Sequence, residues 1–163
     1  MQQRGATLIQ MMCALALVSL LAQVGLPAYA NLSHDLHQAA AARYLAQALR
    51  SARSHAVLQQ QAVQVQALEG DWGLGWRTHL AHNGQLLHEQ RLVRRLEIAS
   101  NVDNQVTFSG LGVPLRGNRG FLGATLEICP RPEQASQYWV VLAPSGRVDL
   151  RTGTRGSSRC AGA

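Results

Sequence analysis

Arg4-Gly5-Ala6-Thr7-Leu8-Ile9-Gln10 runs directly into an apolar stretch that ends near Ala28. In an ordinary secretory signal, the cleavage site follows the apolar region and lies next to small residues. Here the obvious processing site precedes the apolar stretch, so cleavage would leave that stretch on the mature chain. This order of segments predicts a mature protein that keeps a long apolar N-terminal helix.

The apolar segment, residues 6–28, contains no charged residue. A helix rises about 1.5 Å per residue, so about 20 residues cross the hydrocarbon core of a bilayer. Arg4 is the only charged residue before the segment, which favours a cytoplasmic leader and places the bulk of the chain outside. We therefore expect a single-pass membrane protein. The alternatives are a plain signal anchor and an uncleaved signal peptide.

The rest of the chain, roughly 130 residues, is long enough for one domain with a modest core. All fifteen basic residues are arginine, and the formal net charge is +6. A basic excess affects partners and solubility rather than the fold. The guanidinium fork suits phosphates and carboxylates, although genomic base composition is the simpler explanation for the absence of lysine.

The chain has three cysteines, of which Cys13 lies inside the apolar segment. Cys129 and Cys160 lie in the exported region, where oxidising conditions allow a disulfide. Closing a loop of that length stabilises a fold by roughly 3–4 kcal/mol in the chain-entropy model. Neither cysteine has a partner at the spacing of zinc ligands, which argues against a metal site.

A helical pattern continues beyond Pro27 to about Gln60. Its apolar stripe changes sides near residue 40, because two sets of residues share roughly opposite faces. A helix with two buried faces needs two partners, so the second half packs on its own domain and the first half on another molecule or the bilayer. The first set is Tyr29, Leu32, Leu36 and Ala40, and the second is Ala41, Leu45, Leu49, Ala52 and Ala56.

From Gln61 the apolar period changes to two, which predicts strands. Asn83-Gly84 is typical of a tight hairpin turn, and the glycine-rich residues 110–123 of a loop. Strands without intervening helices indicate an antiparallel sheet. The candidate strands are one around residues 63–67 and residues 74–80, 85–94, 105–108, 124–129, 138–142 and 146–151.

The fold class is therefore α+β, with a long N-terminal helix packed on an antiparallel β-sheet domain. The helix has a transmembrane half and an amphipathic half. The expected segments are a leader (residues 1–5), a transmembrane segment (6–28), an amphipathic helix (29–60) and a β-rich periplasmic domain (61–163).

The N-terminal stretch resembles the type IV prepilin leader, whose usual form is Gly-Phe-Thr-Leu-Ile-Glu. The resemblance implies a prepilin peptidase that cuts after Gly5 and methylates Ala6. Gln10 stands where most pilins carry a glutamate, which in the family meets the amino terminus of a neighbouring subunit during filament assembly. Pro27 matches a proline that kinks many pilin helices. The resemblance implies the fold of a type IV pilin, held in the inner membrane by one transmembrane helix with its C-terminal domain in the periplasm.

The soluble part resembles the GspH/FimT group of minor pilins and pseudopilins. Three runs carry the likeness in order: Asp71-Trp72-Gly73-Leu74-Gly75-Trp76, Val106-Thr107-Phe108-Ser109-Gly110-Leu111-Gly112, and Leu126-Glu127-Ile128-Cys129 followed by Ser145-Gly146-Arg147-Val148. The resemblance implies a structural protein without a cofactor, which primes or caps a pilus with other minor and major pilins. A pseudopilin of a type II secretion system is the alternative within the group.

The C-terminal arginines are the best candidate for binding chemistry. Arg147, Arg151, Arg155 and Arg159 recur at every fourth residue in a glycine- and serine-rich segment. Guanidinium groups that neutralise DNA phosphates release counterions and make binding sensitive to salt. FimT-type members take up DNA through a Gly-Arg-x-Arg element, and the run here is Gly146-Arg147-Val148-Asp149. An ordinary solvated tail and a membrane-anchored DNA receptor outside the filament are the alternatives.

The remaining candidates favour structural interpretations. No nucleophile elbow, phosphate loop or zinc-protease motif occurs, so we expect no enzyme activity. The histidines lack a third ligand at convincing spacing, so no metal site is expected. Arg91, Arg94 and Arg95 on a probable strand favour salt bridges to neighbouring subunits. Trp72 and Trp76 favour core or edge packing over base stacking. The six histidines are residues 34, 37, 55, 79, 82 and 88.

Overall fold

The computed structural model describes residues 8–115, 123–129, 136–153 and 159–160. These contain one long helix, α1 (Leu8–Gln59), and nine strands. The chain forms two compact units, residues 1–36 and residues 37–163. The leader residues Gly5 and Ala6 lie outside the described residues.

In the first unit, α1 runs without interruption through residue 27, and Gln10 is exposed. This part of the helix contains a window long and apolar enough to cross a membrane by length and composition, and none of it is buried within the chain. Tyr29, Leu32 and Leu36 are also exposed. These three residues of the predicted first stripe therefore have no covering partner among the described residues, whereas Ala40, the fourth, is half-buried.

In the second unit, α1 buries the other predicted stripe. Its members are all between 0% and 2% exposed: Ala41, Leu45, Leu49, Ala52 and Ala56. The predicted change of side is confirmed for this half of the helix. The helix ends at Gln59, and Gln60 follows with φ of 52°. The Gln61 N–H donates to the Ala56 carbonyl at 3.2 Å and the Gln60 N–H to Val57 at 3.3 Å, which is the Schellman arrangement that closes many helices.

The strands form two antiparallel sheets, where the sequence predicted one. The five-stranded sheet has the order β3-β2-β1-β5-β6, and the four-stranded sheet has the order β4-β7-β8-β9. The first contains β1 (Val63–Leu68), β2 (Asp71–Leu80), β3 (Leu86–Arg91), β5 (Gln105–Phe108) and β6 (Pro114–Leu115). The second contains β4 (Glu97–Ser100), β7 (Ala124–Cys129), β8 (Tyr138–Leu142) and β9 (Val148–Thr152).

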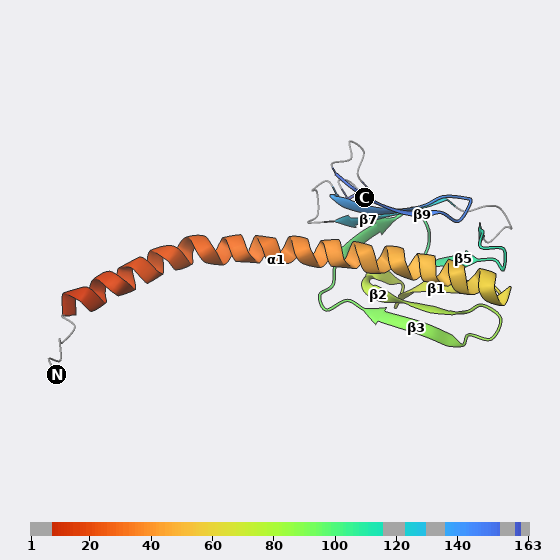
Figure 1. The fold of residues 1–163 in the computed structure, drawn as a ribbon, viewed down its shortest axis with the longest axis horizontal. Helices are drawn as coiled ribbons and strands as arrows, with labels where there is room; N and C mark the ends of the chain where they lie inside the picture. The colour runs from red at the N-terminus through yellow and green to blue at the C-terminus, as the bar shows by residue number, and fades with distance from the viewer. Residues whose placement is uncertain (1–7, 116–122, 130–135, 154–158, 161–163) are drawn as a thin grey trace. The chain divides into compact units, whose positions relative to one another are not determined.

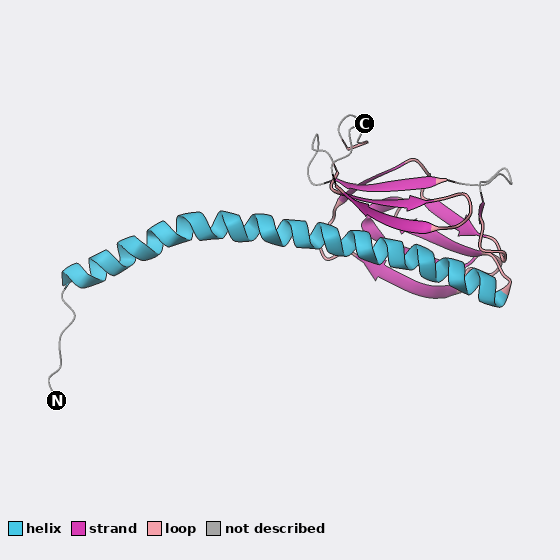
Figure 2. Cartoon of the chain, turned by 45° about the horizontal axis from the view of Figure 1, so that its top comes forward, coloured by secondary structure: helices cyan, strands magenta, loops and turns pink. Residues whose placement is uncertain are grey.

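Within the second unit, α1 runs along both sheets (Figure 1; Figure 2). Every second side chain of the strands points towards the helix, and the buried apolar residues form one large cluster and one smaller cluster. Leu45 and Leu49 of α1, Val65 and Phe108 of the five-stranded sheet and Leu126 of the four-stranded sheet are all 0% exposed. The core therefore lies where the helix and the two sheets meet.

Local differences from the predicted strands have simple causes. β4 was not predicted, because Ile98 is its only large apolar residue and β7 supplies its pairing. β6 is a two-residue strand inside the predicted glycine-rich loop, paired to β5. The hairpin at Asn83-Gly84 forms, but residues 81–85 separate its strands. It is therefore longer than the tight turn that the sequence predicted.

Candidate functional site

The C-terminal segment is anchored to the end of β7 by a disulfide. Cys129, the last residue of β7, is bonded to Cys160, with the two Cα atoms 5.5 Å apart. Both cysteines are buried, at 3% and 6% exposure. The bridge that the sequence predicted is present in the structure.

A buried carboxylate provides a second anchor beside this disulfide. Glu127 lies two residues before Cys129 on β7, so both side chains leave the same face of the strand. Glu127 is 0% exposed, and its Oε2 accepts a hydrogen bond from the Arg159 backbone N–H at 2.9 Å. Sequence reasoning missed Glu127, although an acidic residue in the alternating run before a bridging cysteine was a usable signal.

Three of the four C-terminal arginines lie over one face of the four-stranded sheet. Residues that oppose each other across an antiparallel pair project to the same face. Arg151 on β9 opposes Trp139 on β8, and Trp139 opposes Glu127 on β7. Arg147 shares this face with Arg151 by the period of two, and Arg159 is held there through Glu127. Arg155 lies outside the described residues.

The acidic residue of this segment neutralises one of its arginines. Arg147 Nε lies 2.9 Å from Asp149 Oδ2, and the two side chains are 69% and 36% exposed. Arg151 and Arg159 are exposed and form no ion pair within the described part of the chain. The half-buried Trp139 opposite Arg151 was also missed by sequence reasoning, and its indole adds an aromatic surface to the same face.

Two of the sequence runs that resemble the GspH/FimT group, the one ending at Gly112 and the one containing Gly146, lie in contact with each other. Two arginines of α1 donate hydrogen bonds to their backbone carbonyls. Arg53 Nε donates to the Gly112 carbonyl at 3.1 Å, and Arg50 Nη2 donates to the Val148 carbonyl at 3.0 Å. Gly146 has φ of +82°, and a Cβ placed on it would lie 2.1 Å from the Gly112 carbonyl oxygen. Residue 146 therefore has to be glycine for these two runs to make this close backbone contact.

The second basic cluster consists of Arg91, Arg94 and Arg95, which the sequence predicted to lie on one strand. Only Arg91 lies on a strand in the structure. Arg91 ends β3 and pairs with Glu89 at 2.8 Å, whereas Arg95 pairs with Asp71 at 2.9 Å. Arg94 lies after the strand has ended. Two of these three arginines thus form exposed ion pairs within the chain, and salt bridges to neighbouring subunits stay a prediction.

The tryptophans of β2 pack as predicted. Trp72 is 4% exposed and Trp76 is 0% exposed, and both belong to the core. Among the histidines, burial and, second, the charge of Arg77 lower the pKa of His79. The described residues contain no group of three His, Cys, Asp or Glu side chains placed to hold a metal ion.

An apolar N-terminal helix that continues into an antiparallel β domain defines the type IV pilin-like class of protein. Residues 41–146 match the family model described as Type II transport protein GspH. Because this match covers more than half of the chain, the chain belongs to this family, within the GspH/FimT group of minor pilins and pseudopilins. The family and the fold are those of structural proteins that assemble with other pilins.

The solved structures of one minor pilin are similar to this chain. Crystal structures of the Pseudomonas aeruginosa (strain PAO1) type IV minor pilin FimU match in two space groups. The P21 form has 24% sequence identity and a TM-score of 0.63, covering 77% of this chain and 98% of FimU. The P65 form has 25% identity and a TM-score of 0.60, covering 72% and 97%. No curated protein sequence gives a significant match.

Proposed function

We propose that the chain is a minor type IV pilin that primes or caps a pilus filament and presents its arginine-bearing face to DNA. The observation that carries this proposal is the fold shared with the minor pilin FimU over 77% of the chain. The exposed apolar half of α1 supports it, because that surface needs a bilayer before assembly and neighbouring helices afterwards.

In this proposal, prepilin peptidase cuts between Gly5 and Ala6 and methylates the new amino terminus. The mature chain then waits in the inner membrane with its β domain in the periplasm. Gln10 accepts a hydrogen bond from a neighbouring amino terminus but offers no countercharge to it. A subunit without that carboxylate suits a position at the filament end better than one repeated along its length.

Filament membership is tested by shearing fibres from cells that express the chain and probing the fibres with an antibody. The protein is expected in the sheared fraction, at low copy, only when prepilin peptidase is active. Gln10→Glu is expected to raise its copy number in the fibres. If Gln10→Glu leaves filament entry unchanged, the missing carboxylate has no part in the mechanism. A chain that stays in the membrane fraction is instead a receptor outside the filament.

The DNA part of the proposal rests on the positions of Arg147, Arg151 and Arg159 over one sheet face with Trp139. Gel-shift binding of the full chain is compared with that of an Arg147→Ala, Arg151→Ala, Arg155→Ala variant at low salt. The variant is expected to bind DNA more weakly and with a shallower salt dependence, because phosphate contacts release counterions. Equal affinities would show that the three substituted arginines do not bind DNA.

A pseudopilin of a type II secretion system is the second candidate, and the description of the matched family favours it. Neighbouring genes for secretion components, together with loss of protein secretion on deletion, would select this candidate. Neighbouring pilus genes, together with loss of fibres, would select the minor pilin.

A further inference from the structure

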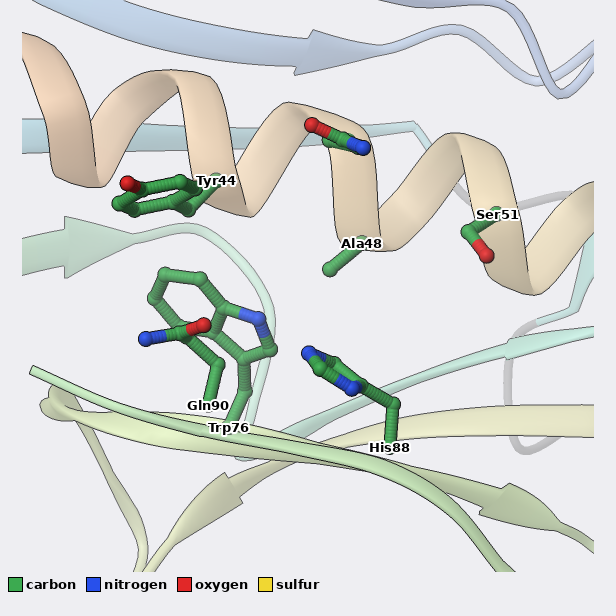
Figure 3. A pocket seen from close by; sticks show the side chains of 7 residues that line it. Tyr44, Ala48, Ser51, Trp76, His88 and Gln90 are labelled. Carbon is green, nitrogen blue, oxygen red and sulfur yellow. The ribbon is translucent and has the colours of Figure 1, made fainter.

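A groove lies between α1 and the β2–β3 hairpin, within the second unit. Its volume is about 330 Å³, near the lower end of the range for ligand sites. Figure 3 shows Tyr44, Ala48 and Ser51 on the helix facing Trp76, His88 and Gln90 on the strands. Gln47 completes the lining.

The floor of the groove contains a buried donor without an acceptor. Trp76 Nε1 is buried and has no hydrogen-bond partner among the residues that the structure describes. The other indole of β2 is satisfied, because Trp72 Nε1 donates to the Asp103 carbonyl at 3.2 Å. A buried donor left unpaired loses its hydrogen bond to water without a replacement, and an indole nitrogen can only donate. The groove therefore favours an occupant with a hydrogen-bond acceptor.

A smaller hollow extends the groove along the helix. It shares Tyr44 and Gln90 with the groove and continues past Arg91 and Arg94 to His37. Among the residues that the structure describes, neither hollow is lined by an aspartate or a glutamate. Arg91 is paired with Glu89, but Arg94 has no ion-pair partner in the described part of the chain. The two hollows together, called the hairpin channel below, offer donors and one available cation.

The dimensions of the hairpin channel suit an extended peptide. Along α1 it spans His37 to Ser51, which at the helical rise is about 21 Å. An extended chain covers that distance in about six residues. β3, which forms one wall, is an edge strand paired only with β2, so the channel lies beside an open sheet edge.

We propose that the hairpin channel docks an acidic segment of a partner pilin. A carboxylate or carbonyl oxygen of the segment accepts the Trp76 Nε1–H, and another carboxylate faces Arg94. The partner is a protein because the channel fits a peptide of about six residues, and acidic because the described part of the lining holds two arginines and no aspartate or glutamate. This inference rests on the proposed place of the chain in a filament.

The direct test follows the indole N–H signals of the full chain in detergent micelles by NMR. The chain has three tryptophans, and Trp72→Phe and Trp139→Phe variants assign their signals. The probe is an acetylated, amidated hexapeptide of alternating glutamate and alanine. It is expected to shift the Trp76 signal saturably and to leave those of Trp72 and Trp139 in place.

Two exposed substitutions make the test specific. Arg94→Ala is expected to weaken peptide binding at least fivefold, whereas the control Arg77→Ala, at the opposite face of the hairpin, leaves it unchanged. Gln47→Phe narrows the groove and is expected to abolish the shift. The proposal is overturned if millimolar peptide moves no Trp76 signal, if a glutamine–alanine hexapeptide moves it equally, or if only a single-stranded oligonucleotide moves it.

A cellular test separates this inference from filament membership. Gln47→Phe and Arg94→Ala chains are expected in sheared fibres at one fifth or less of the wild-type amount. If both enter fibres like the wild type, the hairpin channel does not dock a partner and the inference fails. If the wild type itself never enters fibres, the filament proposal fails, and the peptide titration still decides whether the channel binds an acidic segment.

Discussion

The buried side chain of Glu127 accepts a hydrogen bond from the Arg159 backbone N–H, with 2.9 Å between Oε2 and the nitrogen. This carboxylate on β7 therefore holds the residue that directly precedes the bridging Cys160. Hydrogen bonds to charged groups contribute about 1.5–3 kcal/mol. Glu127→Ala is expected to lower the free energy of unfolding by about that amount, measured by urea denaturation of the full chain. The control is Glu97→Ala on the neighbouring strand β4, where the side chain is exposed. If both variants lose the same free energy of unfolding, the hydrogen bond from Arg159 to Glu127 does not stabilise the fold.

The disulfide is expected to stabilise the folded chain because it restricts the conformations of the unfolded chain. Cys129 and Cys160 are separated by 31 residues, and closing such a loop restricts the unfolded state by about 3–4 kcal/mol. The Cys129→Ala, Cys160→Ala double variant should lose that stability in urea denaturation. Glu127 anchors the same segment as the disulfide. Glu127→Ala should therefore lower the free energy of unfolding by less in the chain without the disulfide than in the chain that has it. Strict additivity would show that the two anchors act independently.

Asp149 is expected to restrain DNA binding by holding Arg147 at 2.9 Å. Asp149→Asn removes the countercharge and should increase DNA affinity, with a steeper fall of affinity as salt rises. Arg151→Ala should reduce the slope of log affinity against log salt by about 1. Both changes are measured by gel shift over a salt series. An Asp149→Asn chain that binds no more tightly than the wild type would show that Arg147 does not reach DNA.

Gly146 and Gly84 form a matched pair for testing the close contact of the two loop motifs. Both have positive φ, +82° and +69°. A Cβ on Gly84 meets nothing within 4 Å, whereas one on Gly146 lies 2.1 Å from the Gly112 oxygen. Gly84→Ala should cost about 1–2 kcal/mol from backbone strain alone. Gly146→Ala should cost clearly more in thermal or urea unfolding, and equal costs would refute the role of the contact.

His79 gives the fold a predictable response to acid. Burial, with a smaller effect of Arg77, lowers the pKa of His79 from its usual 6.5 in the folded chain. The unfolded chain therefore binds the proton more readily, and stability falls as the pH drops through 6.5 towards the folded pKa. His79→Gln should flatten the loss of stability between about pH 7.5 and 5.5. His82→Gln, three residues further along in the exposed turn, is the control and should leave the slope nearly unchanged.

Much of the fold followed from periodicity. The stripe from Ala41 to Ala56 was predicted because a helix repeats every 3.6 residues, and a strand such as β1 because alternation marks a half-buried surface. β4 was missed because its pairing with β7, about 30 residues away in the chain, decides its conformation. Distant partners also explain why one sheet was predicted and two are present.

The candidate site was predicted less completely for the same reason. The cysteine pair was recognisable from composition and compartment, and the arginines from their spacing. Glu127 and Trp139 join the site only through strand register, which brings β7, β8 and β9 side by side. The pairing of Arg147 with Asp149 depends on side-chain geometry that spacing alone does not give.

The course of β4 has a consequence for folding kinetics. After β3 the chain leaves one sheet, pairs with β7 in the other, and returns so that Val106 on β5 pairs with Val65 on β1. The strands of the two sheets therefore alternate along the chain, and pairings between distant residues form slowly. We expect a single cooperative transition with no half-folded species, so that damage to either sheet shortens the lifetime of the whole domain.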